Sequence, residues 1–244
     1  MNMPMERALF KKSGMKYIVS EHCHAVKHTW LNLVTPHLEL PNIQPCIRLY
    51  KPLFLAMCAL LHDNALTQYI SEELKKDSVI DLKKDLSEEK TNLHCIYGEK
   101  NITKLPFKTD VSNVILYHHE HADGTGPFQK KWNEIPLFAR IIHLADIIDI
   151  IRNSIDSDDN SWDFMCQYLS KNKDSLFDSE CVNAFLHVFT KESFMCLSDV
   201  SFETMLWEAI PREKLVFDWE MCKDVADFFA KIVDYKSSFT SRHG

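Results

Sequence analysis

Glycine is scarce in this sequence, with five residues among 244. Segments that alternate apolar and polar residues, as half-buried strands do, are also few. Long stretches instead place apolar residues at helical spacing. The scarcity of glycine and the helical period together predict an all-α fold with little or no sheet.

Closely spaced cysteine pairs are missing as well. None of the eight cysteines forms a C-x-x-C pair, and they are spread along the chain. At this length, that pattern favours reduced, mostly buried thiols over a disulfide framework. No stretch near the start resembles a signal peptide, and the longest apolar run, around PLFLAMCALLH, is too short to cross a bilayer. We therefore expect a soluble cytoplasmic protein with no membrane partner.

The sequence also lacks an excess of positive charge. Its formal net charge is −7, which argues against a surface for DNA or anionic membranes. A small anionic substrate is still compatible, because a local metal cluster can reverse the field where the substrate binds.

The apolar periodicity predicts helices over residues 17–34, 46–63, 108–121, 136–153, 162–173 and 179–192, and a long final helix after a linker near residue 200. Pro52 marks a start or a break in the second of these, and Pro136 suits a first helical turn. Residues 66–90 are polar with mixed charge, which is typical of a solvated loop or a mobile lid.

The densest group of metal-type ligands is YHHEHADGTGPF, residues 117–128. His118 and His119 are adjacent, and adjacent side chains on a helix diverge by about 100°. They can serve one site only at a helix end, or if two metals take one each. Gly124 and Gly126 would let the chain turn sharply and approach a ligand closely. The residues leave open the alternative of a polar helix terminus with exposed histidines and a glycine stop.

Two further segments carry candidate ligands. His62 and Asp63 close an apolar helix, as a metal-binding pair or as an ordinary helix cap and turn. Along residues 136–153, polar residues repeat at three-residue spacing and share one side of an apolar helix. These residues are Arg140, His143, Asp146 and Asp149. The isoleucines around them favour burial, and burial favours a site that satisfies them.

Other histidines are harder to rank from spacing. His22, His24 and His28 lie close together, and the last two are four residues apart, so they could chelate as a pair. His94 stands alone, and by itself it is more typical of a core or surface histidine.

Together these segments resemble the HD-GYP family, a branch of the HD-domain metal phosphohydrolases. The family pattern runs H-x-x-x-V, H-D, H-P-x-x-G, H-H-E-x-x-D-G-x-G-Y-P and I-P-x-x-A-R-I-x-x-x-A-D. The order and spacing here agree over roughly residues 15–190. The matching segments are His22 to Val26, His62–Asp63, His94 to Gly98, His118 to Gly126 and Ile135 to Asp146.

The resemblance implies an all-α HD-domain helical bundle, here over residues 1–200, with a C-terminal helical extension. It implies hydrolysis of a cyclic dinucleotide, cyclic di-GMP or cyclic GMP-AMP, with His62 and Asp63 as catalytic residues and Asp63 as a bridging carboxylate. The implied metal ligands are His22, His62, Asp63, His94, His118, His119 and Asp146. The implied substrate-binding residues are Asp123, Gly124, Gly126, Arg140 and Asp149.

The departures from the family pattern are specific. Leu66 replaces the lysine of H-D-x-G-K, and Gly126-Pro127-Phe128 replaces G-Y-P, so the tyrosine is lost. Ile18 stands where three-metal members carry a glutamate, so we expect two divalent ions, iron or manganese. These changes keep two alternatives open. One is a catalytically impaired regulatory or dimerisation module that still binds metal, and the other is an HD phosphohydrolase with another phosphoester substrate.

The C-terminal residues FFAKIVDYKSSFTSRHG resemble the start of a second HD domain, with His243 at the position of His22. We therefore expect residues 201–244 to form a linker and a long helix that belongs to a tandem arrangement. The expected partner is a second HD domain, or a second copy of the chain that pairs through this helix. The alternative is an ordinary C-terminal helix with a polar end.

Overall fold

A computed structural model of the protein describes residues 54–69, 88–107, 109–154, 161–195 and 217–237. Its helices are α6 (Glu88–Ile102), α7 (Leu137–Ser154), α8 (Ser161–Lys171), α9 (Ser179–Val188), α10 (Lys191–Met195) and α12 (Trp219–Ser237). Residues 54–61 and 66–69 are also helical. Within these ranges there is no strand, only an isolated bridge between Lys173 and Phe177. The all-α prediction is confirmed.

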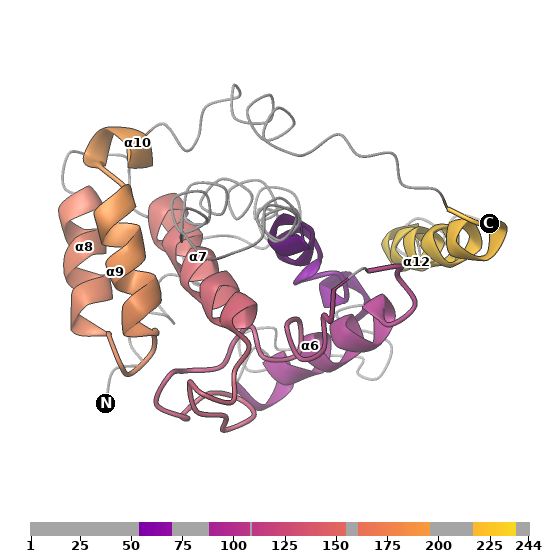
Figure 1. The fold of residues 1–244 in the computed structure, drawn as a ribbon, viewed down its shortest axis with the longest axis horizontal. Coiled ribbons are helices and arrows are strands. Elements are labelled where there is room, and N and C mark those ends of the chain that lie inside the picture. Colours follow the sequence, from indigo (N-terminus) through magenta and orange to yellow (C-terminus); the bar gives the residue numbers. More distant parts are fainter. Residues whose placement is uncertain (1–53, 70–87, 108, 155–160, 196–216, 238–244) are drawn as a thin grey trace, which may run out of the picture.

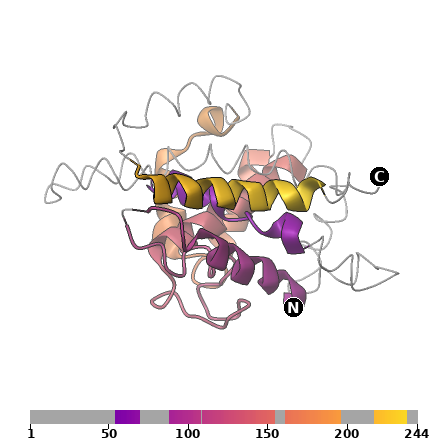
Figure 2. The same ribbon diagram turned by 90° about the vertical axis from the view of Figure 1, so that its right-hand side faces the viewer.

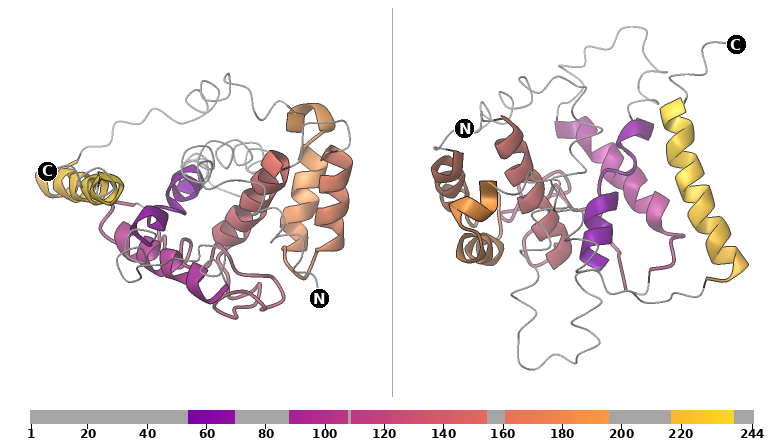
Figure 3. Two further views of the ribbon diagram at one scale, coloured as in Figure 1. Left: turned by 180° about the vertical axis from the view of Figure 1, so that it is seen from behind. Right: turned by 90° about the horizontal axis from the view of Figure 1, so that it is seen from above.

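Figure 1 shows the helices spread from one end of the molecule to the other, in an order that differs from their order along the chain. Helices α8 and α9 lie side by side at one end, with α10 beside them, and α7 is next to this pair. Helical residues 54–69 and α6 occupy the middle, and α12 lies at the opposite end, as the view from above in Figure 3 also shows. Figure 2 shows α12 running along the whole of that end.

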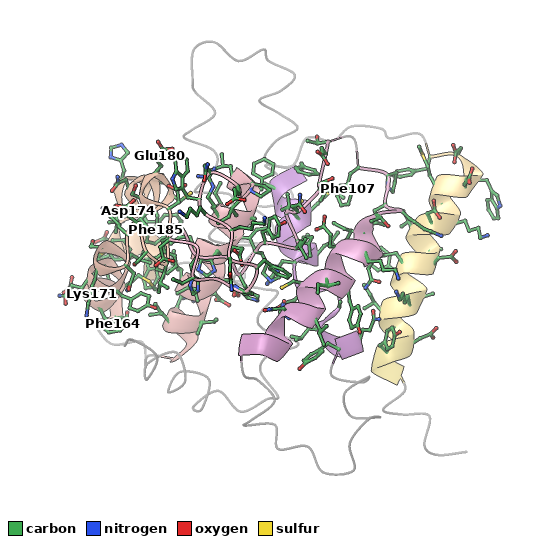
Figure 4. All side chains as sticks on the ribbon, turned by 90° about the horizontal axis from the view of Figure 1, so that it is seen from below. Phe107, Phe164, Lys171, Asp174, Glu180 and Phe185 are labelled. Atoms are coloured by element: carbon green, nitrogen blue, oxygen red, sulfur yellow. The ribbon has the colours of Figure 1, made fainter. Side chains whose placement is uncertain are left out.

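Helix α7 joins two apolar clusters, and this determines where its polar side can point. The first cluster, on α7, α8, α9 and α10, includes Leu144, Ile148, Ile151, Met165, Leu169, Val182, Phe185 and Phe194. The second, around residues 54–61, includes Phe54, Leu55, Ile102, Val114, Ile115, Ile142, Ala145 and Phe228. In Figure 4, Phe164 and Phe185 lie at the α8–α9 end of the molecule, and Phe107 lies in the second half. The polar residues of α7 are therefore held inside the molecule, as the isoleucine-rich sequence predicts.

Local signals explain where two of the helices begin. Helix α7 starts directly after Pro136, whose carbonyl accepts a hydrogen bond from the Arg140 N–H at 3.1 Å. Asp178 caps α9, because its carboxylate accepts from the backbone N–H of Glu180 at 2.7 Å and of Cys181 at 3.4 Å. The sequence pattern predicts the helix start at Pro136 and does not predict the cap by Asp178.

Two helix predictions need correction. The helix predicted over residues 179–192 is two helices, because Phe189 is extended, with φ −88° and ψ 135°, and separates α9 from α10. The helix predicted over residues 108–121 is wrong, because residues 112–119 form successive turns. Asn113 has a φ of 65°, in the left-handed region that breaks a regular helix. The Glu99 carboxylate on α6 accepts from the N–H of Asn113 at 2.6 Å and of Leu116 at 2.9 Å, which fixes these turns against α6.

The helices predicted at residues 136–153 and 162–173 and the long final helix are confirmed by α7, α8 and α12. The helix predicted over residues 46–63 is helical over residues 54–61, its described part before the turn. Helix α6 contains His94 and has no counterpart among the predicted helices. The predicted helix at 17–34, His22, most of the polar segment 66–90, and His243 lie outside the described residues. Across the described ranges, no helix combines the length and the apolar character needed to cross a membrane.

Candidate metal centre

Six of the seven predicted metal ligands lie in the described part of the chain, and they come from four separate segments. His62 and Asp63 lie in the turn that follows helical residues 54–61. His94 lies on α6, and Asp146 lies on α7. The neighbours His118 and His119 end the turns of residues 112–119. The seventh predicted ligand, His22, lies outside the described residues.

Asp63 lies at the centre of this group. Its Oδ2 atom is 3.3 Å from Nε2 of His62. Its Oδ1 atom is 3.4 Å from Nε2 of His94 and 3.7 Å from Nε2 of His118. Nε2 of His62 also lies 3.9 Å from Oδ1 of Asp146. The two oxygens of Asp63 thus face different histidines, which is the arrangement that a bridging carboxylate needs.

The buried histidines are oriented by the backbone. Nδ1 of His62 lies 2.7 Å from the Ala59 carbonyl, and Nδ1 of His118 lies 2.6 Å from the Ile115 carbonyl. A carbonyl only accepts, so each Nδ1 carries the proton and each Nε2 presents its lone pair when the ring is neutral. His62 is 1% exposed and His118 is 0% exposed, and neither Nε2 makes a hydrogen bond to another described residue. Burying two such atoms is costly unless they bind something, and a divalent cation would satisfy both.

The charges of the cluster are strongly coupled. Burial alone would lower the pKa of His62, but the carboxylates of Asp63 and Asp146 outweigh it and raise the pKa to about 9. Burial likewise opposes ionisation of Asp63, yet His62 first, and then His118 and His94, hold its pKa well below the usual value. Burial, reinforced by His118 and His94, lowers the pKa of His119 well below its usual value. Asp63 is therefore ionised and His119 neutral, which are the states that ligate metals, whereas His62 would release its proton on binding a metal.

The donor atoms form two overlapping groups. One contains His62, Asp63 and His118, and the other contains His94, Cys95, His118 and His119, and within each group the donor atoms lie within 4.8 Å of one another. The rings of His118 and His119 are 4.0 Å apart between centroids, with 43° between their planes. The adjacent histidines can therefore serve one cluster because they end a turn rather than lie within a helix.

The loop after these histidines contains three of the predicted substrate-binding residues, and its turns use their special properties. Asp123 Oδ1 accepts from the N–H of Thr125 at 2.9 Å and from its hydroxyl at 2.7 Å. Gly124 has a φ of +84°, which favours glycine. A Cβ at Gly126 would lie 2.6 Å from the backbone nitrogen of His121 and 2.7 Å from Cα of Glu120. Gly124 therefore allows the sharp turn, and Gly126 allows a close approach to the loop's own backbone, while the predicted approach to a ligand stays a prediction.

Glu120, the third residue of the H-H-E motif, is a buried carboxylate beside the histidine pair. It is 2% exposed, and its two carboxylate oxygens accept from the N–H groups of Phe128 and Lys130, each at 2.5 Å. It therefore holds the far side of the loop against the histidine pair. The only sequence signal for this role is its place in the H-H-E motif.

The polar side of α7 is enclosed as predicted. Arg140 forms an ion pair with Asp178, the cap of α9, and lies over the Trp132 ring, 5.6 Å from its centroid. His143 is 5% exposed, and burial first and His121 second lower its pKa to about 3. Asp149, predicted to bind substrate, is 1% exposed. The substrate-binding roles of Asp123, Gly124, Gly126, Arg140 and Asp149 stay predictions.

Comparison with known proteins identifies the family. The HD domain family model matches residues 48–181, more than half of the chain. The chain belongs to the HD domain family, and it is a divergent HD-GYP-like member, as the motifs predict.

Two curated relatives come from Vibrio cholerae serotype O1. The 3'3'-cGAMP-specific phosphodiesterase 1 is 23% identical over 204 residues, which cover 75% of this chain and 43% of that protein. The 3'3'-cGAMP-specific phosphodiesterase 3 is 27% identical over 163 residues, which cover 65% of this chain and 34% of that protein. The chain thus spans less than half the length of either relative.

A solved structure supports the fold. The crystal structure of the V. cholerae cyclic GMP-AMP specific phosphodiesterase V-cGAP3 matches with a TM-score of 0.68 and 22% sequence identity. The match covers 97% of this chain and 60% of that one. At this identity the likeness establishes the fold, which is the predicted all-α HD-domain bundle.

Proposed function

We propose that the chain is a metal-dependent phosphodiesterase that hydrolyses a cyclic dinucleotide, with 3'3'-cGAMP as the first candidate. The observation that carries the proposal is the buried cluster of histidines around Asp63, in which the Nε2 atoms of His62 and His118 face inward without a hydrogen-bond partner among the described residues. Cyclic GMP-AMP ranks ahead of cyclic di-GMP because both curated relatives are named for 3'3'-cGAMP.

The ligand set supports two divalent ions, iron or manganese. His62 and Asp63 would hold one ion, His94 and His119 the other, and His118 lies within reach of both groups. Asp63 would bridge the two positions, Asp146 would complete the first, and His22 would add the remaining nitrogen. Bound ions would supply a water of lowered pKa and positive charge beside the phosphoryl oxygens. The chain's own contribution is to fix the tautomers of His62 and His118 and to enclose the centre.

The substrate side differs more from the family than the metal side does. Leu66 stands at the lysine position, and Pro127 and Phe128 stand where the family has tyrosine and proline. These changes favour two alternatives: a metal-binding module without turnover, or hydrolysis of another phosphoester. One turnover assay distinguishes each alternative from the proposed hydrolysis of a cyclic dinucleotide.

The assay uses the full chain purified without oxygen and supplied with Mn²⁺ or Fe²⁺. Turnover is measured with 3'3'-cGAMP, cyclic di-GMP and bis(p-nitrophenyl) phosphate as a general phosphodiester. The proposal predicts hydrolysis of 3'3'-cGAMP that Asp63→Ala abolishes. Metal binding without turnover of any of the three would contradict it in favour of the module, and turnover of the general probe alone would point to another phosphoester.

We further propose that α12 pairs with a second HD-type domain, supplied in the isolated chain by a second copy. Phe228 is 6% exposed and packs on the helical body, whereas Trp219, Phe229 and Val233 are 85%, 56% and 58% exposed. Light scattering should show a dimer that Phe229→Glu with Val233→Glu converts to a monomer. A monomeric unmodified chain would contradict the pairing.

A further inference from the structure

We infer that the Cys95 thiolate is an additional ligand in this centre, so that the metal position held by His94 and His119 has a mixed nitrogen and sulfur ligand set. The inference rests on the metal centre of the proposed function and adds a residue to it. It also assigns the two positions different metal preferences.

The distances agree with a coordination sphere. The Cys95 Sγ atom lies 3.4 Å from Nε2 of His94. In a tetrahedral site with a metal–sulfur bond of about 2.3 Å and a metal–nitrogen bond of about 2.05 Å, the sulfur and nitrogen are separated by about 3.5 Å. Sγ also belongs to the group of four donors, with His118 and His119, that lie within 4.8 Å of one another. Although His94 and Cys95 are adjacent on α6, their ligand atoms lie on the same side of the helix, as the distance between them shows.

A second observation points to a ligand at the same place. His118 is fully buried, and its Nε2, the donor that the group shares, makes no hydrogen bond to any described residue. Its Nδ1 is committed to the Ile115 carbonyl at 2.6 Å, so the ring cannot turn to satisfy Nε2 without losing that bond. One of the four ligand atoms therefore has a buried lone pair that lacks a hydrogen-bond donor or a cation.

The other buried thiols provide the contrast. Cys58 and Cys181 belong to the two apolar clusters, where a cysteine serves as a small apolar side chain. Cys95 is 0% exposed and belongs to neither cluster, and its Sγ atom lies within contact distance of a histidine of the metal centre. It also stands where the family pattern H-P-x-x-G has proline.

Binding would replace the S–H bond by an S–metal bond and release the proton to the buffer. A thiolate with two or three imidazoles selects zinc or another borderline-soft ion, whereas a position built from carboxylate oxygen and imidazole accepts manganese or iron. The centre would therefore favour a mixed pair of metals, with the softer ion at Cys95.

The test uses Co²⁺ as a spectroscopic probe in the metal-free full chain. A thiolate bound to Co²⁺ gives an intense near-ultraviolet charge-transfer band, which a centre with only nitrogen and oxygen ligands lacks. We expect the band in the unmodified chain and its loss in Cys95→Ser and Cys95→Ala. The matched variants Cys58→Ala and Cys181→Ala should keep it. Equilibrium dialysis should show Co²⁺ affinity at one position reduced by about tenfold or more in the Cys95 variants, since even ligand-supporting residues are worth 10–100-fold.

The outcomes separate this inference from the proposed function. Bound Co²⁺ without the band in the unmodified chain would overturn the role of Cys95 and leave the metal centre standing. Failure to bind Co²⁺ at all would overturn both. If the Cys95 variants do not fold by circular dichroism, X-ray absorption of the unmodified zinc-loaded chain decides. A sulfur neighbour at about 2.3 Å from zinc supports the inference, and its absence overturns it.

Discussion

The buried histidine cluster and the loop beside it, residues 120–131, contain similar polar residues and differ in how these residues are satisfied. In the cluster, the inward Nε2 atoms of His62 and His118 have no hydrogen-bond partner within the described ranges. In the loop, the Asp123 carboxylate accepts from Thr125, and the Glu120 carboxylate accepts from Phe128 and Lys130. The cluster leaves two histidine nitrogens available to a ligand. The carboxylate oxygens of the loop already accept hydrogen bonds from the loop itself.

This difference separates residues that act on a ligand from residues that hold the site together. A family motif places both kinds side by side, so the motif alone cannot distinguish them. Removing a cluster residue should change metal binding and leave the fold intact. Removing a loop residue, or the ion pair behind it, should lower the free energy of unfolding and leave metal content unchanged.

Asp63→Ala should have the largest effect on function. Both proposed metal positions lose their shared carboxylate, so metal content should fall by at least about tenfold, since even supporting residues are worth 10–100-fold in affinity. Elemental analysis measures the loss, and circular dichroism checks that the chain stays folded. The matched variant Asp123→Ala, on the exposed loop, should keep its metal. Unchanged metal content in Asp63→Ala would show that this residue is not a ligand.

Arg140→Met should have the largest effect on stability. It leaves the buried Asp178 carboxylate without its guanidinium partner, at a cost of about 3 kcal/mol in the free energy of unfolding. Denaturant unfolding measures the cost, and Arg140→Lys, which keeps the charge, should lose less. Loss of metal with unchanged stability would instead place Arg140 with the cluster.

Gly126→Ala should destabilise the loop by about 1–3 kcal/mol, because the added Cβ would collide with backbone atoms of Glu120 and His121. Gly98→Ala is the matched control. A Cβ there would meet side-chain atoms of Ile115 at 3.0 Å and Asn64 at 3.1 Å, and alanine gains about 1 kcal/mol of helix propensity within α6. Equal melting temperatures for the two variants would contradict the close approach at Gly126.

Glu120→Gln should have the smallest effect, about 1–2 kcal/mol, because the amide nitrogen cannot accept from one of the two backbone N–H groups. Glu134→Gln, at an exposed position, should change the unfolding free energy by less than about 0.5 kcal/mol. A Glu120 variant that loses metal without losing stability would move Glu120 into the cluster.

The sequence carried enough information for the polar side of α7 and for the His62–Asp63 turn, because both depend on local spacing within an apolar segment. It did not predict the turns at residues 112–119, because they depend on the Glu99 carboxylate from α6 and on the left-handed Asn113. The backbone partners of Glu120 and the place of Cys95 beside His94 were not predicted, for a related reason. Their environments are created by segments that meet only in the folded chain, and neither residue has a periodic pattern that signals its neighbours.

The most direct test of the central claim is the metal content of the full chain purified without oxygen. The histidine and aspartate cluster predicts about two transition-metal ions per chain, which a chelator removes and which Asp63→Ala fails to hold. A properly folded chain that contains no bound metal, and takes up none when iron, manganese or zinc is supplied, would contradict the account.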